Sequence, residues 1–136
     1  MAIAAYGKSV EAKFKKHKTR YSIEFDTTGL IQDAELEVNW IDITPFTKAA
    51  ISAQLEDMCT KYKTKKIQIQ YTGSESNILT YLSGQAEAKN LTTRYELVVK
   101  CKNIKDVKLF EYLFSDKGIL LESSEIVFKN SSNLEY

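Results

Sequence analysis

Residues 21–38, YSIEFDTTGLIQDAELEV, align without a gap on residues 110–127, FEYLFSDKGILLESSEIV. Phe25 falls on Phe114, Gly29 on Gly118 and Val38 on Val127. In both stretches apolar and polar residues alternate on either side of a glycine, which is the pattern of two half-buried strands joined by a tight turn. The alignment therefore predicts the same β-hairpin twice, once in each half of the chain.

Alternation extends outward from both hairpins. It predicts a strand over residues 8–15 before the first hairpin and strands over 67–71 and 95–102 before the second. Between the two blocks, Thr44 and Pro45 begin a helix expected to reach Lys63, with an apolar stripe of Ile51, Leu55, Met58 and Tyr62. A short helix is expected near residues 77–83, ended by Gly84.

The predicted fold class is α+β: a mostly antiparallel sheet from two βββ units, with one long central helix and one short helix packed on it. At 136 residues the chain has the length of one ordinary domain, here made of two related halves, about 8–72 and 73–136. Hydrophobic residues make up 43% and charged residues 27%, so the composition is that of a folded globular protein. No apolar run is long enough for a transmembrane helix.

The net charge of +1 gives no general attraction to nucleic acid or acidic lipid. A basic run does occur, at Lys13, Lys15, Lys16, Lys18 and Arg20 around the only histidine, His17. Outward lysines opposite Glu24, with Glu35 and Glu37 one strand further, are the ordinary charge pairing of a solvated sheet face. We therefore predict no nucleic-acid binding.

Catalytic, cofactor and metal motifs are lacking in the sequence. A single histidine does not make a metal site, the glycines form no phosphate-binding loop, and no carboxylate pair stands out among acids spread over outward strand positions. We expect no catalytic residues, no cofactor and no metal, and hence no enzyme. Cys59 and Cys101 are either buried free thiols or one long-range disulfide.

The aromatic strand, Asp-x-x-Gly turn and second strand of YSIEFDTTGLI, repeated in part as YLFSDKGILL, resemble the hairpin of PepSY-like domains from exported proteins of Bacteroidota. The fold of those domains is related to that of the β-lactamase-inhibitor protein. The resemblance implies a non-enzymatic binding or inhibitory module that is periplasmic or secreted. Since residues 1–10 do not look like a signal peptide, it also implies that one has been removed.

The two hairpins differ on their outward faces. The first carries Glu24, Asp26, Asp33 and Glu35, whereas the second half places Val98, Leu109 and Leu113 at outward positions. An apolar patch on a solvent face meets a partner or is covered by the protein's own short helix or residues 3–6. Trp40 either caps the core edge or stands exposed as an anchor. The candidate interaction surface is Val98, Leu109, Leu113 and Trp40.

We expect an unknown protein or peptide partner in the cell envelope, and a monomer or weak homodimer. A small-molecule carrier or enzyme, with a pocket between the helix and a curved sheet, is the alternative.

Overall fold

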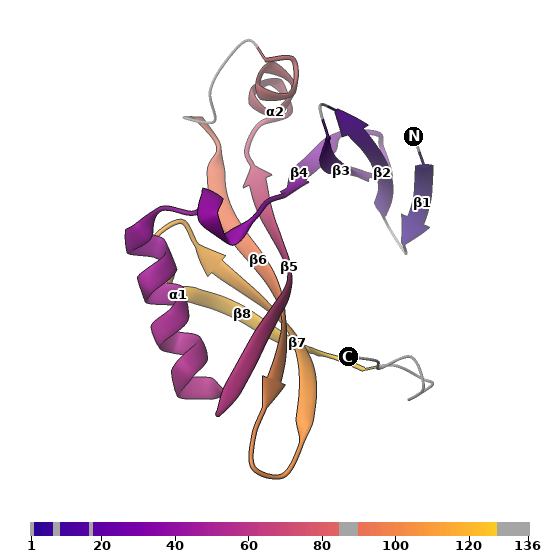
Figure 1. Ribbon diagram of the computed structural model, residues 1–136. Coiled ribbons are helices and arrows are strands. Elements are labelled where there is room, and N and C mark those ends of the chain that lie inside the picture. The colour runs from indigo at the N-terminus through magenta and orange to yellow at the C-terminus, as the bar shows by residue number, and fades with distance from the viewer. Residues whose placement is uncertain (1, 7–8, 17, 85–89, 128–136) are drawn as a thin grey trace.

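A computed structural model describes residues 2–6, 9–16, 18–84 and 90–127. Within these ranges eight strands form one antiparallel sheet, in which every strand pairs with its neighbours in sequence (Figure 1). The strands are β1 (Ala2–Tyr6), β2 (Ser9–Lys16), β3 (Thr19–Asp26), β4 (Ile31–Glu37), β5 (Lys61–Thr72), β6 (Thr92–Lys102), β7 (Val107–Ser115) and β8 (Leu120–Ile126). The predicted α+β class with an antiparallel sheet is confirmed.

Helical segments between the strands of the described ranges include the 3-10 turn η1 (Trp40–Asp42), α1 (Pro45–Met58) and α2 (Glu75–Leu82). Pro45 opens α1 where its missing N–H costs no hydrogen bond. Ser74 caps α2, because its Oγ accepts from Asn77 N at 3.1 Å. Gly84 follows α2 with φ of 78°, a conformation that glycine adopts readily. No helix in the described ranges is long and apolar enough to span a membrane.

The long helix is shorter than predicted, and the strand after it is longer. The helix ends at Met58, and Tyr62, expected on its apolar stripe, lies in β5. Lys61, Lys63, Lys65 and Lys66 likewise belong to β5 and not to a helix C-terminus. The sequence Lys-Tyr-Lys-Thr-Lys alternates with period 2, so it suits a strand, and pairing with β6 outweighs the helical spacing of Tyr62.

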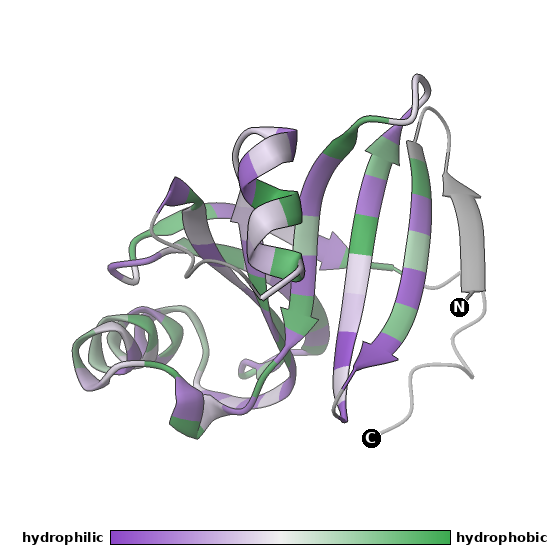
Figure 2. Cartoon of the chain, turned by 90° about the horizontal axis from the view of Figure 1, so that it is seen from above, coloured by the Kyte–Doolittle hydropathy of each residue, from purple (hydrophilic) through white to green (hydrophobic). Residues whose placement is uncertain are grey.

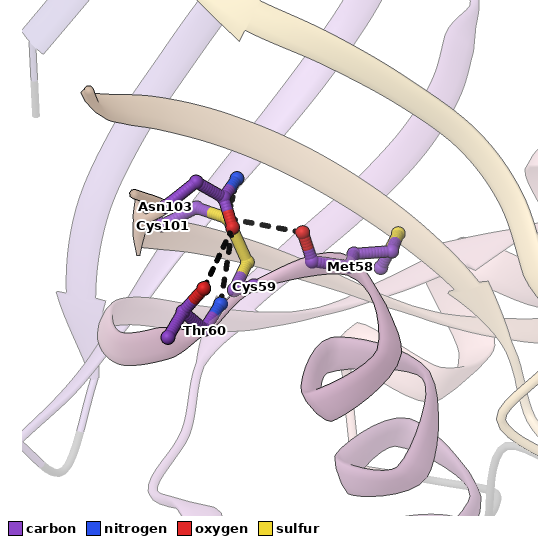
Figure 3. Close-up of a disulfide and its surroundings, with 5 residues drawn as sticks. All are labelled: Met58, Cys59, Thr60, Cys101 and Asn103. Carbon is purple, nitrogen blue, oxygen red and sulfur yellow. Dashed lines mark hydrogen bonds between the residues drawn. A yellow bond between two sulfur atoms is a disulfide. The ribbon is translucent and has the colours of Figure 1, made fainter. Parts of the chain in front are cut away.

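A disulfide joins Cys59, just after α1, to Cys101 in β6, with the two Cα atoms 5.3 Å apart (Figure 3). This answers the question that the sequence leaves open. Beside it, Asn103 Oδ1 accepts from Thr60 N at 3.1 Å. A bridge between residues 42 positions apart is typically worth about 2–4 kcal/mol of stability. It fastens the end of α1 to the sheet at the start of β5.

Two apolar clusters share one face of the sheet. In the larger, Ile51 and Leu55 of α1 pack on Leu97, Val99 and Phe114, and all five are 0% exposed. In the smaller, Ile78 of α2 packs with Ala34 and Leu36 of β4, with Tyr71 of β5 and with Leu91, which precedes β6. Cross-strand pairing of Leu36 with Ile69 and of Ile69 with Tyr95 places both clusters on the same side. Each helix therefore covers one part of one face, which we call the helix face.

The two aligned hairpins are built alike. Tyr21 pairs with Leu36 and Phe25 with Ile31 in the first; their aligned residues Phe110 and Glu125, and Phe114 and Leu120, pair in the second. Both have a bulge before the phenylalanine, between Glu24 and Phe25 or Leu113 and Phe114. Gly29 and Gly118 have φ of 89° and 82°. The predicted turns are confirmed to the level of register.

Candidate functional site

The strands are two-faced, and both helices pack on the helix face alone. Alternating hydrophobic and hydrophilic bands along β2 and β3 show this two-sidedness (Figure 2). The opposite side, which we call the open face, carries the residues between the core positions. Its central members are Glu11, Ser22, Glu24, Asp33, Glu35, Gln68, Gln70, Glu96, Val98, Leu109, Glu111 and Leu113. It is the candidate site.

Carboxylates gather on the N-terminal half of the open face. Glu11 pairs with Glu24, and Glu24 pairs with Asp33, on three successive strands. Glu35 lies next along β4, and Glu96 is reached across β5. Like charges opposite one another destabilise a sheet unless protons or cations compensate. When these carboxylates are ionised, their mutual repulsion therefore destabilises this part of the sheet.

Burial and mutual repulsion change the proton affinity of these groups. Desolvation, followed by the charge of Glu24, raises the pKa of Asp33 to about 7. Desolvation and the charge of Glu96 raise the pKa of Glu35 to about 8, and desolvation with Glu111 raises that of Glu96 to about 7. Around neutral pH the cluster holds protons that exposed carboxylates have lost.

Amide and hydroxyl groups sit among the carboxylates. Ser22 Oγ donates to Glu11 Oε1 at 2.7 Å. Gln68, with its amide nitrogen turned toward the acids, donates to Glu35 Oε2 at 2.9 Å and to Glu96 Oε1 at 3.2 Å. Gln70 Oε1 is buried and has no hydrogen-bond partner in the described part of the chain. Once these carboxyl groups lose their protons, above their raised pKa values, the cluster is rich in acceptors and short of donors.

A groove of about 650 Å³ follows this cluster. Half-buried Glu11, Glu24, Glu35 and Glu96 line it together with Gln68 and Gln70. Exposed cationic residues also line it, namely Lys13, Lys15, Arg20 and Lys66. Two of these are engaged at the surface, since Lys13 Nζ lies 3.3 Å from Glu11 and Arg20 lies 4.0 Å from Glu37. The acids form the floor of the groove, and the bases stand at its rim.

Val98, Leu109 and Leu113 do share the open face, each half-buried. None of them lies directly opposite another, because Val98 pairs with the exposed Glu111, Leu109 with Lys100 and Leu113 with Glu96. The cover expected from residues 3–6 or from the short helix is not observed. Strand β1 pairs with β2 at the far edge of the sheet, and α2 packs on the helix face.

Trp40 lies in η1 and packs, partly buried, against the larger core cluster. Of its two predicted roles the structure shows the core-edge one. His17 lies outside the described residues. The neighbouring lysines of β2 line the groove in part, as the outward positions of the alternation predicted. In the described ranges no three His, Cys, Asp or Glu side chains are grouped so as to hold a metal ion.

The carboxylate cluster is the feature that sequence reasoning missed. The sequence pattern predicts that its acids are evenly spread over solvated, outward strand positions. A signal was present, because Glu11, Glu24, Asp33 and Glu35 all take the outward phase on three consecutive strands. Glu96 could not be added to them without knowing that β5 lies between β4 and β6.

No protein-family model matches the chain, and no curated protein matches it. Solved structures do. A DUF2874 family protein from Bacteroides uniformis superimposes with a TM-score of 0.67 at 10% identity, over 96% of this chain and 80% of that chain. One from Bacteroides ovatus gives 0.64 at 12% identity, over 98% of this chain and 83% of that one.

A BLIP-like protein from Bacteroides fragilis gives a TM-score of 0.62 at 15% identity, over 95% of this chain and 76% of that chain. At such identities the likeness concerns the fold. The expected similarity to the β-lactamase-inhibitor-protein fold in Bacteroidota is thereby confirmed: this chain shares its fold with a BLIP-like protein and with DUF2874 family proteins from Bacteroides.

Proposed function

We propose that this protein is a non-enzymatic binding or inhibitory module of the cell envelope or the secreted fraction, and that it binds a protein or peptide through its open face. One observation carries the proposal. Both helices pack on the helix face, and the described residues leave half-buried apolar groups and desolvated carboxylates on the other. Groups that are already partly removed from water in the free protein lose little further hydration when a partner protein covers them, so this surface is suited to binding one.

The fold likeness supports a binding role. One structural neighbour is described as BLIP-like, and the resemblance to PepSY-like domains likewise implies binding or inhibition. We propose that this chain is a member of the PepSY-like group, because its two hairpins carry the related turns Asp-x-x-Gly, at residues 26–29, and Ser-x-x-Gly, at residues 115–118. Their matching registers and bulges also support a single domain of two related βββ halves, residues 8–72 and 73–136.

The disulfide supports an exported location. Bridges such as Cys59–Cys101 persist in the periplasm and outside the cell and are rare in the cytosol. An envelope protein would meet its partner there, as a monomer or a weak homodimer.

Affinity capture from envelope extract tests the function when it is done with paired variants. Leu113→Asp places a charge on the open face, and Ile104→Asp makes the same change in the β6–β7 turn, where Ile104 is 96% exposed. We expect to capture a partner that the wild type and the Ile104→Asp variant bind alike. The Leu113→Asp variant should capture at least about tenfold less of it. Leu109→Asp should act like Leu113→Asp.

Thermal unfolding of each variant is the control, because both leucines are half-buried. Loss of folding in Leu109→Asp and Leu113→Asp would show that they are core residues. A partner retained by folded open-face variants would contradict the proposal.

A further inference from the structure

The groove on the open face combines two layers of opposite charge. Its floor is acidic and half-buried, and its rim is basic and exposed. Six lining residues are glutamates, of which Glu11, Glu24, Glu35, Glu37 and Glu96 are half-buried and Glu111 is exposed. Four are cationic, Lys13, Lys15, Arg20 and Lys66. An occupant that complements both layers carries a cation at its tip and anions at its sides.

The floor of the groove has more hydrogen-bond acceptors than donors. Its carboxylates repel one another, and Gln70 Oε1 lacks a donor among the described residues. A buried acceptor without a partner lowers the stability of the free protein, and an incoming N–H group that donates to it removes this cost. A cation at this place would relieve the repulsion and satisfy the amide together.

The arrangement favours a planar, many-donor cation over a metal ion. The floor acids Glu11, Glu24, Glu35 and Glu96 are distributed over four strands, and no three of the described acids are close enough to one another to ligate one ion. A guanidinium spreads five N–H donors over a plane and so reaches separated acceptors, whereas an ammonium acts as a point charge. A groove of about 650 Å³ has room for such a side chain and the residues beside it.

We propose that this groove receives an arginine side chain of the partner protein, presented by a segment with acidic residues on both sides of the arginine. The guanidinium lies among Glu24, Glu35, Glu96 and Gln70, and the flanking carboxylates lie at Lys13, Lys15, Arg20 and Lys66. The inference rests on the proposed protein-binding function and names the site and chemistry of the contact.

A pair of short peptides tests the assignment without knowledge of the partner. The probe is acetyl-Asp-Arg-Asp-amide, and its control replaces arginine by citrulline, which has the same shape without the charge. Each is titrated into the disulfide-bonded protein at about pH 8 while backbone amide resonances are followed. We expect the arginine peptide to shift the resonances of Gln68, Gln70 and their neighbours, with at least about tenfold higher affinity than the citrulline peptide.

Two variants localise the effect. Glu35→Gln with Glu96→Gln removes the central charges and should abolish the arginine preference. Glu125→Gln makes the same kind of change on β8, where Glu125 pairs with Phe110 of the helix face, and should leave it intact. A third peptide, with lysine in place of arginine, tests the preference for a guanidinium over an ammonium. Equal binding of the arginine and citrulline peptides by the wild type, shifts outside the groove, or equal binding of the lysine peptide would overturn the assignment.

Binding of the captured natural partner to the variants tests the arginine site separately from the proposed function on which it rests. Loss of the partner in Leu113→Asp, but full retention in the folded Glu35→Gln and Glu96→Gln double variant, would overturn the arginine site alone. Retention in both would overturn the function as well.

Discussion

The first hairpin, residues 21–38, and the second, residues 110–127, have one register and one turn, but they differ in what covers them. At the second turn α1 is in contact: Thr47 Oγ1 donates to Asp116 O at 2.7 Å, and Gln54 Nε2 donates to Gly118 O. At the first turn α2 supplies one contact, where Ile31 N donates to Glu75 Oε2 at 2.9 Å. The same local structure is embedded in one half and exposed in the other.

Their open faces differ even more. Glu24, Asp33 and Glu35 align with Leu113, Glu122 and Ser124. The hairpin itself is fixed by inward aromatics and turn glycines, so these outward positions were free to diverge. The difference teaches that the shared positions are scaffold and that the open-face positions give the sheet an acidic half and a mixed apolar half.

The largest expected effect is a difference in stability between alanine substitutions of the two turn glycines, Gly118 and Gly29. In Gly118→Ala a Cβ would meet Ala50 Cβ at 2.7 Å and Thr47 O at 2.9 Å, in addition to the positive φ. In Gly29→Ala the Cβ meets nothing within 4 Å, so only the conformational cost remains. We expect losses of about 2–4 kcal/mol for Gly118→Ala and about 1 kcal/mol for Gly29→Ala in denaturant unfolding. Equal losses would show that α1 does not hold the second turn.

A smaller effect sharpens the contrast between the open faces. The folded pKa of Asp33, about 7, exceeds its ordinary value of 3.8, so folding binds a proton between these values. Stability therefore falls as pH rises from about 4 to about 7 and stays reduced above. Asp33→Asn removes this penalty. We expect it to stabilise the protein at about pH 9 by about 1–2 kcal/mol, the solvent contact of Asp33 reducing the full value, and to bring no gain at about pH 4.

The matched change is Glu122→Gln, at the aligned and exposed position of the second hairpin. We expect it to alter stability by less than about 0.5 kcal/mol at either pH. Urea unfolding at the two pH values measures both variants. A gain for Asp33→Asn that is independent of pH would contradict the carboxylate repulsion.

The sequence predicted those parts of the fold that depend on local pattern. Both hairpins follow from alternation around Gly29 and Gly118. The predicted end of α1 was wrong, because Tyr62 fits a helical spacing and a strand alternation equally. Only the pairing of Tyr62 with Cys101 in β6 decides between them. Strand β1 was missed because Ala-Ile-Ala-Ala-Tyr has no polar alternation.

The candidate site was predicted in part. Val98, Leu109 and Leu113 follow from the phase of their strands. The groove depends on Glu96 lying one strand beyond Gln68, and on how far each carboxylate is desolvated; both are properties of the assembled sheet.

Cross-linking from two positions tests the central claim, binding through the open face, most directly. A photoreactive benzoylphenylalanine replaces Leu113 on the open face or Phe46 on α1, where the native ring is 72% exposed. The account predicts that position 113 cross-links to the captured partner and that position 46 does not. Cross-links from position 46 with none from position 113 would contradict it.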